Sequence, residues 1–157
     1  MSGWTAGDPS ALSRAGRTGL VVVDAGVVIA HFDGADPHHV AATAALREVA
    51  ATATRLMLPV TALAECLVHP ERAGGDVAER FMAALGSIPI GVADADLRTA
   101  REAARLRAGH PSLRLPDAFV IATAITHRAD TLITTDRDWP QAAMSSFAFT
   151  LHVIGVT

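Results

Sequence analysis

Four acidic side chains stand at positions from which they could hold a divalent metal ion: Asp24, Glu65, Asp117 and Asp136. Asp24 directly follows the apolar run LVVV, and Asp136 follows the run TLIT by two residues. In open α/β sheets the ligand crevice lies outside the carboxyl ends of the strands, so both acids are expected there. Carboxylates are hard oxygen ligands, which suit Mg²⁺ or Mn²⁺ better than zinc. Such a set could support metal-assisted hydrolysis, in which the bound ion generates a hydroxide nucleophile.

The two strand-end acids also have ordinary structural explanations. Asp24 could be the N-cap of a following helix. Asp136 could be a turn aspartate, and Asp138 competes with it for the place of the fourth acid. Four carboxylates in one pocket cannot all stay ionised at neutral pH without cations. At least one of them is therefore expected to bind a proton when metal is absent.

The two helical acids have alternatives of the same kind. Glu65 lies in segment 60–68, where apolar spacing at i, i+3, i+4 and i+7 predicts a helix that is apolar nearly all round and therefore buried. A lone Glu there needs a nearby cation; otherwise it is an ordinary exposed Glu beside Thr61. Asp117 stands in a first helical turn, where acids favour the helix dipole. It also continues the core-facing stripe toward the sheet edge, which favours a functional role.

The elements that position these acids alternate along the chain. Strands are predicted at 20–23, 55–58, 88–92, 131–134 and 149–156, and helices at 25–32, 38–51, 60–68, 76–85, 94–107 and 115–128. Gly26 is expected to allow a tight turn after the first strand. That strand lacks polar alternation, so it is expected to be buried on both faces. Together these features predict a three-layer α/β/α sandwich with a mainly parallel sheet.

Composition sets further bounds on the kind of protein. The 157 residues predict one folded domain at 19–157, after a flexible N-terminal extension at 1–18. A formal net charge of −3 gives no basic signature of nucleic-acid binding, and every basic residue apart from histidine is Arg. Cys66 is the single cysteine, which excludes an intrachain disulfide and fits a cytoplasmic location. No apolar run is long enough to span a membrane.

Three stretches, in order, carry a resemblance to a known family: VVVDAGVVIA, LPVTALAECLV and LPDAFVIATAITHRADTLITTDRDW. Together they resemble a PIN domain, and more narrowly the VapC-type toxins of bacterial toxin–antitoxin pairs. The resemblance covers residues 20–156, and its most specific parts are PDAFVIATA and TTD. The four acids named above match the family's acid positions one by one.

The resemblance implies an Mg²⁺- or Mn²⁺-dependent endoribonuclease that cuts structured RNA, forms a homodimer and is held inactive by a cognate antitoxin. Many members carry Ser, Thr or Asn two residues after the first aspartate, where this chain has Gly26. The hydroxyl or amide that would support the metal ligands is therefore missing at that position. Thr134 and Thr135 are the expected replacements, because both lie close to Asp136 in the chain.

Two alternatives are retained. One is a PIN-like RNA- or protein-binding module that has lost catalysis, which the intact set of acids disfavours. The other is an aspartate-based phosphotransfer domain of receiver or dehalogenase type. Domains of that type rely on a later strand-end Lys, and this chain contains none.

Overall fold

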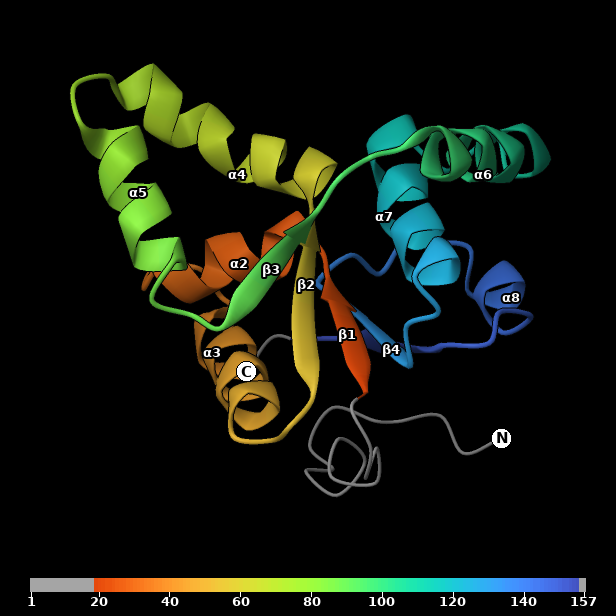
Figure 1. The fold of residues 1–157 in the computed structure, drawn as a ribbon, viewed down its shortest axis with the longest axis horizontal. Helices are drawn as coiled ribbons and strands as arrows, with labels where there is room; N and C mark the ends of the chain where they lie inside the picture. Colours follow the sequence, from red (N-terminus) through yellow and green to blue (C-terminus); the bar gives the residue numbers. More distant parts are fainter. Residues whose placement is uncertain (1–18, 156–157) are drawn as a thin grey trace.

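A computed structural model describes residues 19–155, so the predicted extension at 1–18 lies outside the described residues. One sheet of five parallel strands organises the fold, in the order β3-β2-β1-β4-β5. Figure 1 labels the first four of these strands. The strands are β1 (Leu20–Val23), β2 (Arg55–Pro59), β3 (Ile90–Ala93), β4 (Thr131–Thr134) and β5 (Thr150–Val153). All four residues of the central strand β1 are buried, as its unbroken apolar sequence predicts.

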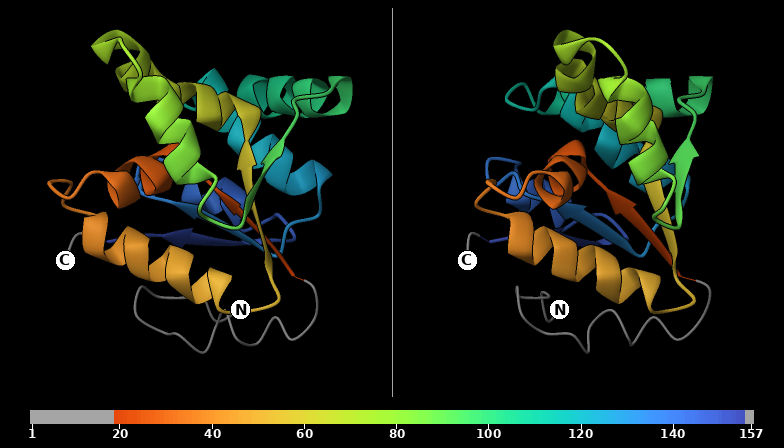
Figure 2. Two further views of the ribbon diagram at one scale, coloured as in Figure 1. Left: turned by 60° about the vertical axis from the view of Figure 1, so that its left-hand side comes forward. Right: turned by 90° about the vertical axis from the view of Figure 1, so that its left-hand side faces the viewer.

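The helices are α2 (Ala25–Phe32), α3 (His39–Ala50), α4 (Val60–Ala73), α5 (Val77–Leu85), α6 (Leu97–Gly109), α7 (Leu115–Thr126) and the short α8 (Gln141–Met144). On one side of the sheet α7 packs against β1, β2 and β4, with α6 packed against α7. Helix α3 packs against β2 on the opposite side (Figure 2). The predicted three-layer α/β/α sandwich is therefore confirmed. No helix in residues 19–155 is long and apolar enough to cross a membrane.

The order of the strands reverses at β1. From β1 the chain moves to β2 and β3 on one side, then returns to place β4 on the other side of β1. The carboxyl ends of β1 and β4 therefore flank a topological switch point, which is where open α/β sheets form a ligand crevice. Helix α4 contacts both α2 and α7, so it brings a third element to this edge.

Helix α4 is longer than predicted, because it continues through Pro70 to Ala73. Its buried residues Ala62, Cys66 and Pro70 are spaced four apart, so Pro70 belongs to the stripe that packs against the core. This packing keeps a proline inside the helix, and the helix ends at Gly74 with a positive φ of 73°. Helix α8 was not predicted, because four residues are too few to show periodicity.

Candidate active site

Asp24 takes its place from the pairing of β1 with β4. The parallel register sets Val23 opposite Ile133, and the Asp24 N–H donates to the Ile133 carbonyl at 2.9 Å. The Thr134 hydroxyl, next along β4, donates to Oδ2 of Asp24 at 2.8 Å. Oδ1 accepts from the N–H of Ala25 at 2.7 Å. Asp24 is thus the N-cap of α2 and also a carboxylate at the crevice, so the two interpretations of this residue are compatible.

Asp24 is only 7% exposed. Burial raises its pKa from 3.8 to about 6, against the opposing effect of hydrogen bonds from Thr134 and Ala25. The charges of Asp117 and Glu65 raise this pKa further, which shows that the three acids act on one another. Asp24 therefore retains a proton below about pH 6 in the metal-free protein.

Asp117 lies buried in the first turn of α7, and Arg114 at the N-cap position of that helix pairs with it. Arg114 donates from Nε to Oδ2 at 2.9 Å and from Nη2 to Oδ1 at 3.3 Å. The guanidinium group therefore engages both oxygens of the carboxylate, a geometry that Lys does not offer. The side chain of Arg114 is 71% exposed, whereas that of Asp117 is 8% exposed. This pairing was not predicted, although the spacing of three residues at a helix start is visible in the sequence.

Glu65 is exposed, and so are its neighbours Ala64, Val68 and His69. The prediction that its helix is buried nearly all round was wrong. Only one stripe of α4 packs inward, because apolar residues on the other faces reach solvent. Arg114 is the nearby cation that was predicted for Glu65, and its charge lowers the pKa of Glu65. Burial and the charge of Asp117 raise this pKa by more, so the pKa of Glu65 lies above its ordinary value.

Asp136 is half-buried in the loop after β4 and is held by Thr134. Its N–H donates to the Thr134 hydroxyl at 3.0 Å, so this one hydroxyl links the backbone of Asp136 to the carboxylate of Asp24. Oδ1 of Asp136 accepts the N–H of Asp138 at 2.7 Å, which closes a turn. Asp138 itself is exposed. The support that Thr134 gives to Asp136 was predicted, whereas its bond to Asp24 was not.

Arg114 connects the acids electrostatically. Its pKa is raised first by the hydrogen bond and charge of Asp117, and further by the charges of Glu65 and Asp136. Asp24 in turn responds to Asp117 and Glu65. The structure therefore brings the four predicted acids to one edge of the sheet, around a guanidinium group that the sequence did not single out.

The four acids offer a divalent metal ion suitable donor atoms, but they are not yet spaced to share one ion. The donors are carboxylate oxygens, the type that Mg²⁺ and Mn²⁺ prefer. Burial raises the pKa of Asp24, and the negative charges of Asp117 and Glu65 add to this rise. Within residues 19–155, however, no three His, Cys, Asp or Glu side chains are close enough together to hold an ion. Asp117 has both oxygens committed to Arg114. The donors fit a divalent cation in type and charge, and a shared ion would need Asp117 to release Arg114.

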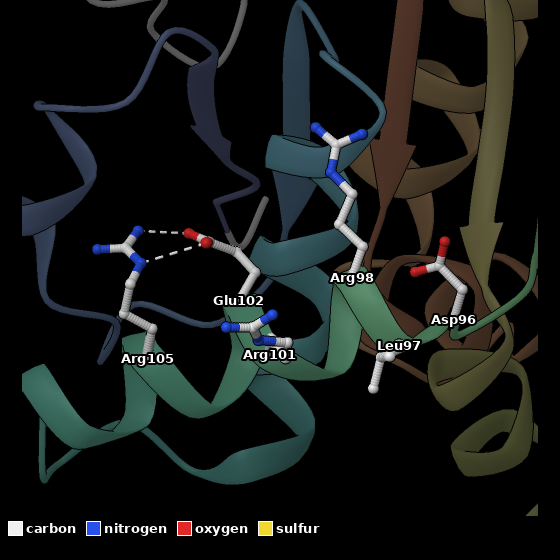
Figure 3. A pocket seen from close by; sticks show the side chains of 6 residues that line it. All are labelled: Asp96, Leu97, Arg98, Arg101, Glu102 and Arg105. Atoms are coloured by element: carbon white, nitrogen blue, oxygen red, sulfur yellow. Dashed lines mark hydrogen bonds and ion pairs between the residues drawn. The ribbon is translucent and has the colours of Figure 1, made fainter.

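Two surface pockets lie near the candidate site or apart from it. One, on α6, is lined by Asp96, Leu97, Arg98, Arg101, Glu102 and Arg105, and Figure 3 shows Arg105 paired with Glu102. The other lies between α2, α4 and α5, and its lining includes Ile29, Phe32, Phe81 and, from the acid cluster, Glu65. The second pocket therefore joins apolar side chains to the edge of the candidate site.

Comparison with known proteins places the chain in a family. The model of the PIN domain family matches residues 21–144. A search of curated proteins found no match.

Among solved structures, VapBC2 from Rickettsia felis, bound to a DNA fragment from its promoter, shares 13% identity over 87% of this chain and 99% of that chain, with a TM-score of 0.64. A toxin–antitoxin complex from Klebsiella pneumoniae shares 21% identity over 87% and 99%, with a TM-score of 0.64. VapC20 from Mycobacterium tuberculosis, a toxin that cleaves the sarcin–ricin loop, shares 18% identity over 83% and 98%, with a TM-score of 0.62.

At these identities the structural likeness establishes the fold, and the family match covers most of the sequence, including all four acids. The chain belongs to the PIN domain family.

Proposed function

We propose that this protein is a metal-dependent endoribonuclease and the toxin component of a VapBC-type toxin–antitoxin pair. The observation that carries the proposal is the Asp24 carboxylate, which is buried at the switch point of a PIN fold with its pKa raised to about 6. A buried acid that responds to two other acids suits cation binding better than capping alone.

The metal ligands in this proposal are Asp24, Glu65, Asp117 and Asp136, with Mg²⁺ or Mn²⁺ as the ion. When bound, the ion supplies a hydroxide nucleophile and neutralises charge that develops on the scissile phosphate. Asp117 would have to release Arg114 in order to hold the ion, and the freed guanidinium group could then bind a phosphate oxygen of the RNA.

Protonation of Asp24 sets the pH dependence of this site. Below pH 6 the folded, metal-free protein holds a proton on Asp24, because burial raises its pKa to about 6. That proton must leave before the carboxylate can bind a cation. Activity is therefore expected to rise between pH 5 and about pH 7. Thr134 keeps Oδ2 oriented throughout, since its hydroxyl is fixed between Asp24 and the backbone of Asp136.

The partners follow from the same proposal: an RNA substrate, a cognate antitoxin and a second copy of the chain in a homodimer. The apolar pocket between α2, α4 and α5 suits a helix or strand of the antitoxin, because exposed Ile29 and Phe32 line it beside Glu65. Structured RNA is proposed as the substrate because the similar VapC20 is a toxin that cleaves the sarcin–ricin loop.

A binding module without catalysis is the main alternative. Its structural support is that no three potential ligands are yet assembled among the described residues. The receiver- or dehalogenase-type phosphotransfer domain loses its support, because the chain matches the PIN family instead.

Cleavage of a defined RNA tests the proposal. The purified chain is incubated with a sarcin–ricin stem-loop and with total RNA, in Mn²⁺, Mg²⁺ or EDTA. Metal-dependent cleavage is expected, and Asp24→Asn should abolish it. Asp94→Asn is the matched control, since Asp94 is an exposed acid in the loop before α6. RNA binding without cleavage under every metal condition would favour the binding module.

A further inference from the structure

Gly26 is the second residue of α2, and its backbone has no need of glycine. Its φ lies outside the left-handed region, where only Gly74 and Gly75 have positive values among the described glycines. The expected tight turn at Gly26 is therefore absent, and the chain passes from Asp24 straight into the helix. Glycine is also unfavourable inside a helix, so a different reason must account for it.

That reason is the side chain of Thr135. A Cβ atom added at Gly26 would come closer to Oγ1 of Thr135 than real Cβ atoms approach any neighbour, while Cβ and Cγ2 of Thr135 would lie at 3.5 and 3.8 Å, ordinary contacts. All three of the heavy atoms nearest to that position, chain neighbours and the backbone of the helix itself apart, belong to Thr135. The Thr135 hydroxyl oxygen is thus the atom that a side chain at position 26 would meet first.

The Thr135 hydroxyl differs from its neighbour in being uncommitted. Thr134 donates to Asp24 and accepts from Asp136, whereas Thr135 makes no hydrogen bond with any residue that the structure describes. Thr135 is half-buried, lies between Thr134 and Asp136 in the chain, and reaches the first turn of α2 beside Asp24. A partly buried hydroxyl without a partner carries an unused donor and two unused lone pairs.

We propose that Gly26 and Thr135 are a size-matched pair that serves the metal site, with Thr135 as a positioning residue. Gly26 leaves room on α2 for the Thr135 hydroxyl, which would donate a hydrogen bond to a water or carboxylate that holds the divalent ion. The inference rests on the proposed metal-dependent function, and it assigns to a loop residue a hydroxyl that α2 itself lacks. Groups that hold ligands or their waters in this way commonly change metal affinity by about 10- to 100-fold when removed.

Mn²⁺ affinity, measured by calorimetry on the full chain, separates the hydroxyl from its bulk. Thr135→Ser keeps the hydroxyl and should bind Mn²⁺ within about twofold of wild type, whereas Thr135→Val keeps the shape and should bind about tenfold more weakly. Gly26→Ala should also weaken binding, because the new methyl group displaces the hydroxyl. In a Thr135→Ala background the same Gly26→Ala change should have no further effect on affinity, since the two Cβ atoms then meet at an ordinary 3.5 Å.

The melting temperature without metal gives an independent test of the size match. In the Thr135→Ala background only helix propensity acts, so Gly26→Ala should raise the melting temperature. When Thr135 is present, the same change should raise the melting temperature by less, or lower it. Equal effects of Gly26→Ala on melting in both backgrounds would overturn the size match. Thr135→Val with wild-type Mn²⁺ affinity would overturn the role of the hydroxyl, even in a protein that cuts RNA. A wild-type chain that neither binds Mn²⁺ nor cuts RNA would instead refute the proposed function together with this role.

Discussion

Replacing Asp24 by Asn should stabilise the metal-free protein at neutral pH. The carboxyl pKa is about 6 in the folded protein against an ordinary value of 3.8. At about 1.4 kcal/mol per pKa unit, ionising Asp24 lowers the free energy of unfolding by about 3 kcal/mol above pH 6. The two oxygens of Asp24 accept from Thr134 and Ala25, whereas Asn has only one acceptor oxygen. Losing one of these hydrogen bonds should lower the free energy of unfolding by about 1 kcal/mol. The net gain is about 2 kcal/mol at pH 7.5.

The sign of the pH dependence follows from where the proton is held. Between pH 3.8 and 6 the folded state binds the proton more tightly than the unfolded state, so wild-type stability falls as pH rises through this window. Below pH 3.8 Asp24 is protonated in both states and the penalty disappears. The advantage of Asp24→Asn should therefore be present at pH 7.5 and absent or reversed at pH 4.

Urea unfolding in EDTA measures the free energy of unfolding of both proteins at pH 4 and pH 7.5. For a chain of this size, a gain of about 2 kcal/mol corresponds to a melting temperature higher by about 4–8 °C. Added Mn²⁺ should raise the melting temperature of wild type and have little effect on Asp24→Asn. The control Asp94→Asn should show no pH-dependent difference from wild type. If Asp24→Asn is less stable than wild type at pH 7.5 and still responds fully to Mn²⁺, Asp24 is only a helix cap and the proposed site is wrong.

Three further outcomes are expected. Thr134→Val removes the hydroxyl that supports Asp24, so it should destabilise the protein by about 1–3 kcal/mol in urea unfolding and lower the rate of RNA cleavage. Arg114→Gln removes the cation that occupies both oxygens of Asp117, so it should strengthen Mn²⁺ binding in calorimetry by up to about fivefold and weaken RNA binding. An unchanged Mn²⁺ affinity would mean that the Arg114–Asp117 pair does not compete with metal. Cys66 is 3% exposed and burial raises its pKa to about 12, so it should react with a thiol reagent at pH 8 only after unfolding in urea.

Local pattern was sufficient to predict the strands on which the site depends. The apolar runs of β1 and β4 match their predicted bounds, and so does α2. The placement of Asp24 and Asp136 at one edge followed from a general property of parallel sheets, without knowledge of which strands are neighbours. The buried position of Asp117 followed from helical periodicity in the same way.

What the sequence did not predict depends on contacts between distant segments. Helix α4 passes through Pro70 because that residue packs on the core, and no local rule for proline contains this information. Arg114 was overlooked because an Arg three residues before an acid is common on any helix surface. Gly26 was expected to serve a turn, since its partner Thr135 lies more than a hundred residues away in the chain.

The hydrogen bond between Thr134 and Asp24 joins residues separated by 110 positions, and it also has a consequence for biosynthesis. Strand β1 leaves the ribosome early, but its neighbour β4 exists only after about five-sixths of the chain has been made. Until then β1 has β2 on one side and an open, apolar edge on the other, which is the kind of edge that other chains can pair with. A nascent or truncated chain that stops before β4 therefore has no complete crevice and is an aggregation hazard. The candidate site is thus completed only when synthesis of the folded domain is nearly finished.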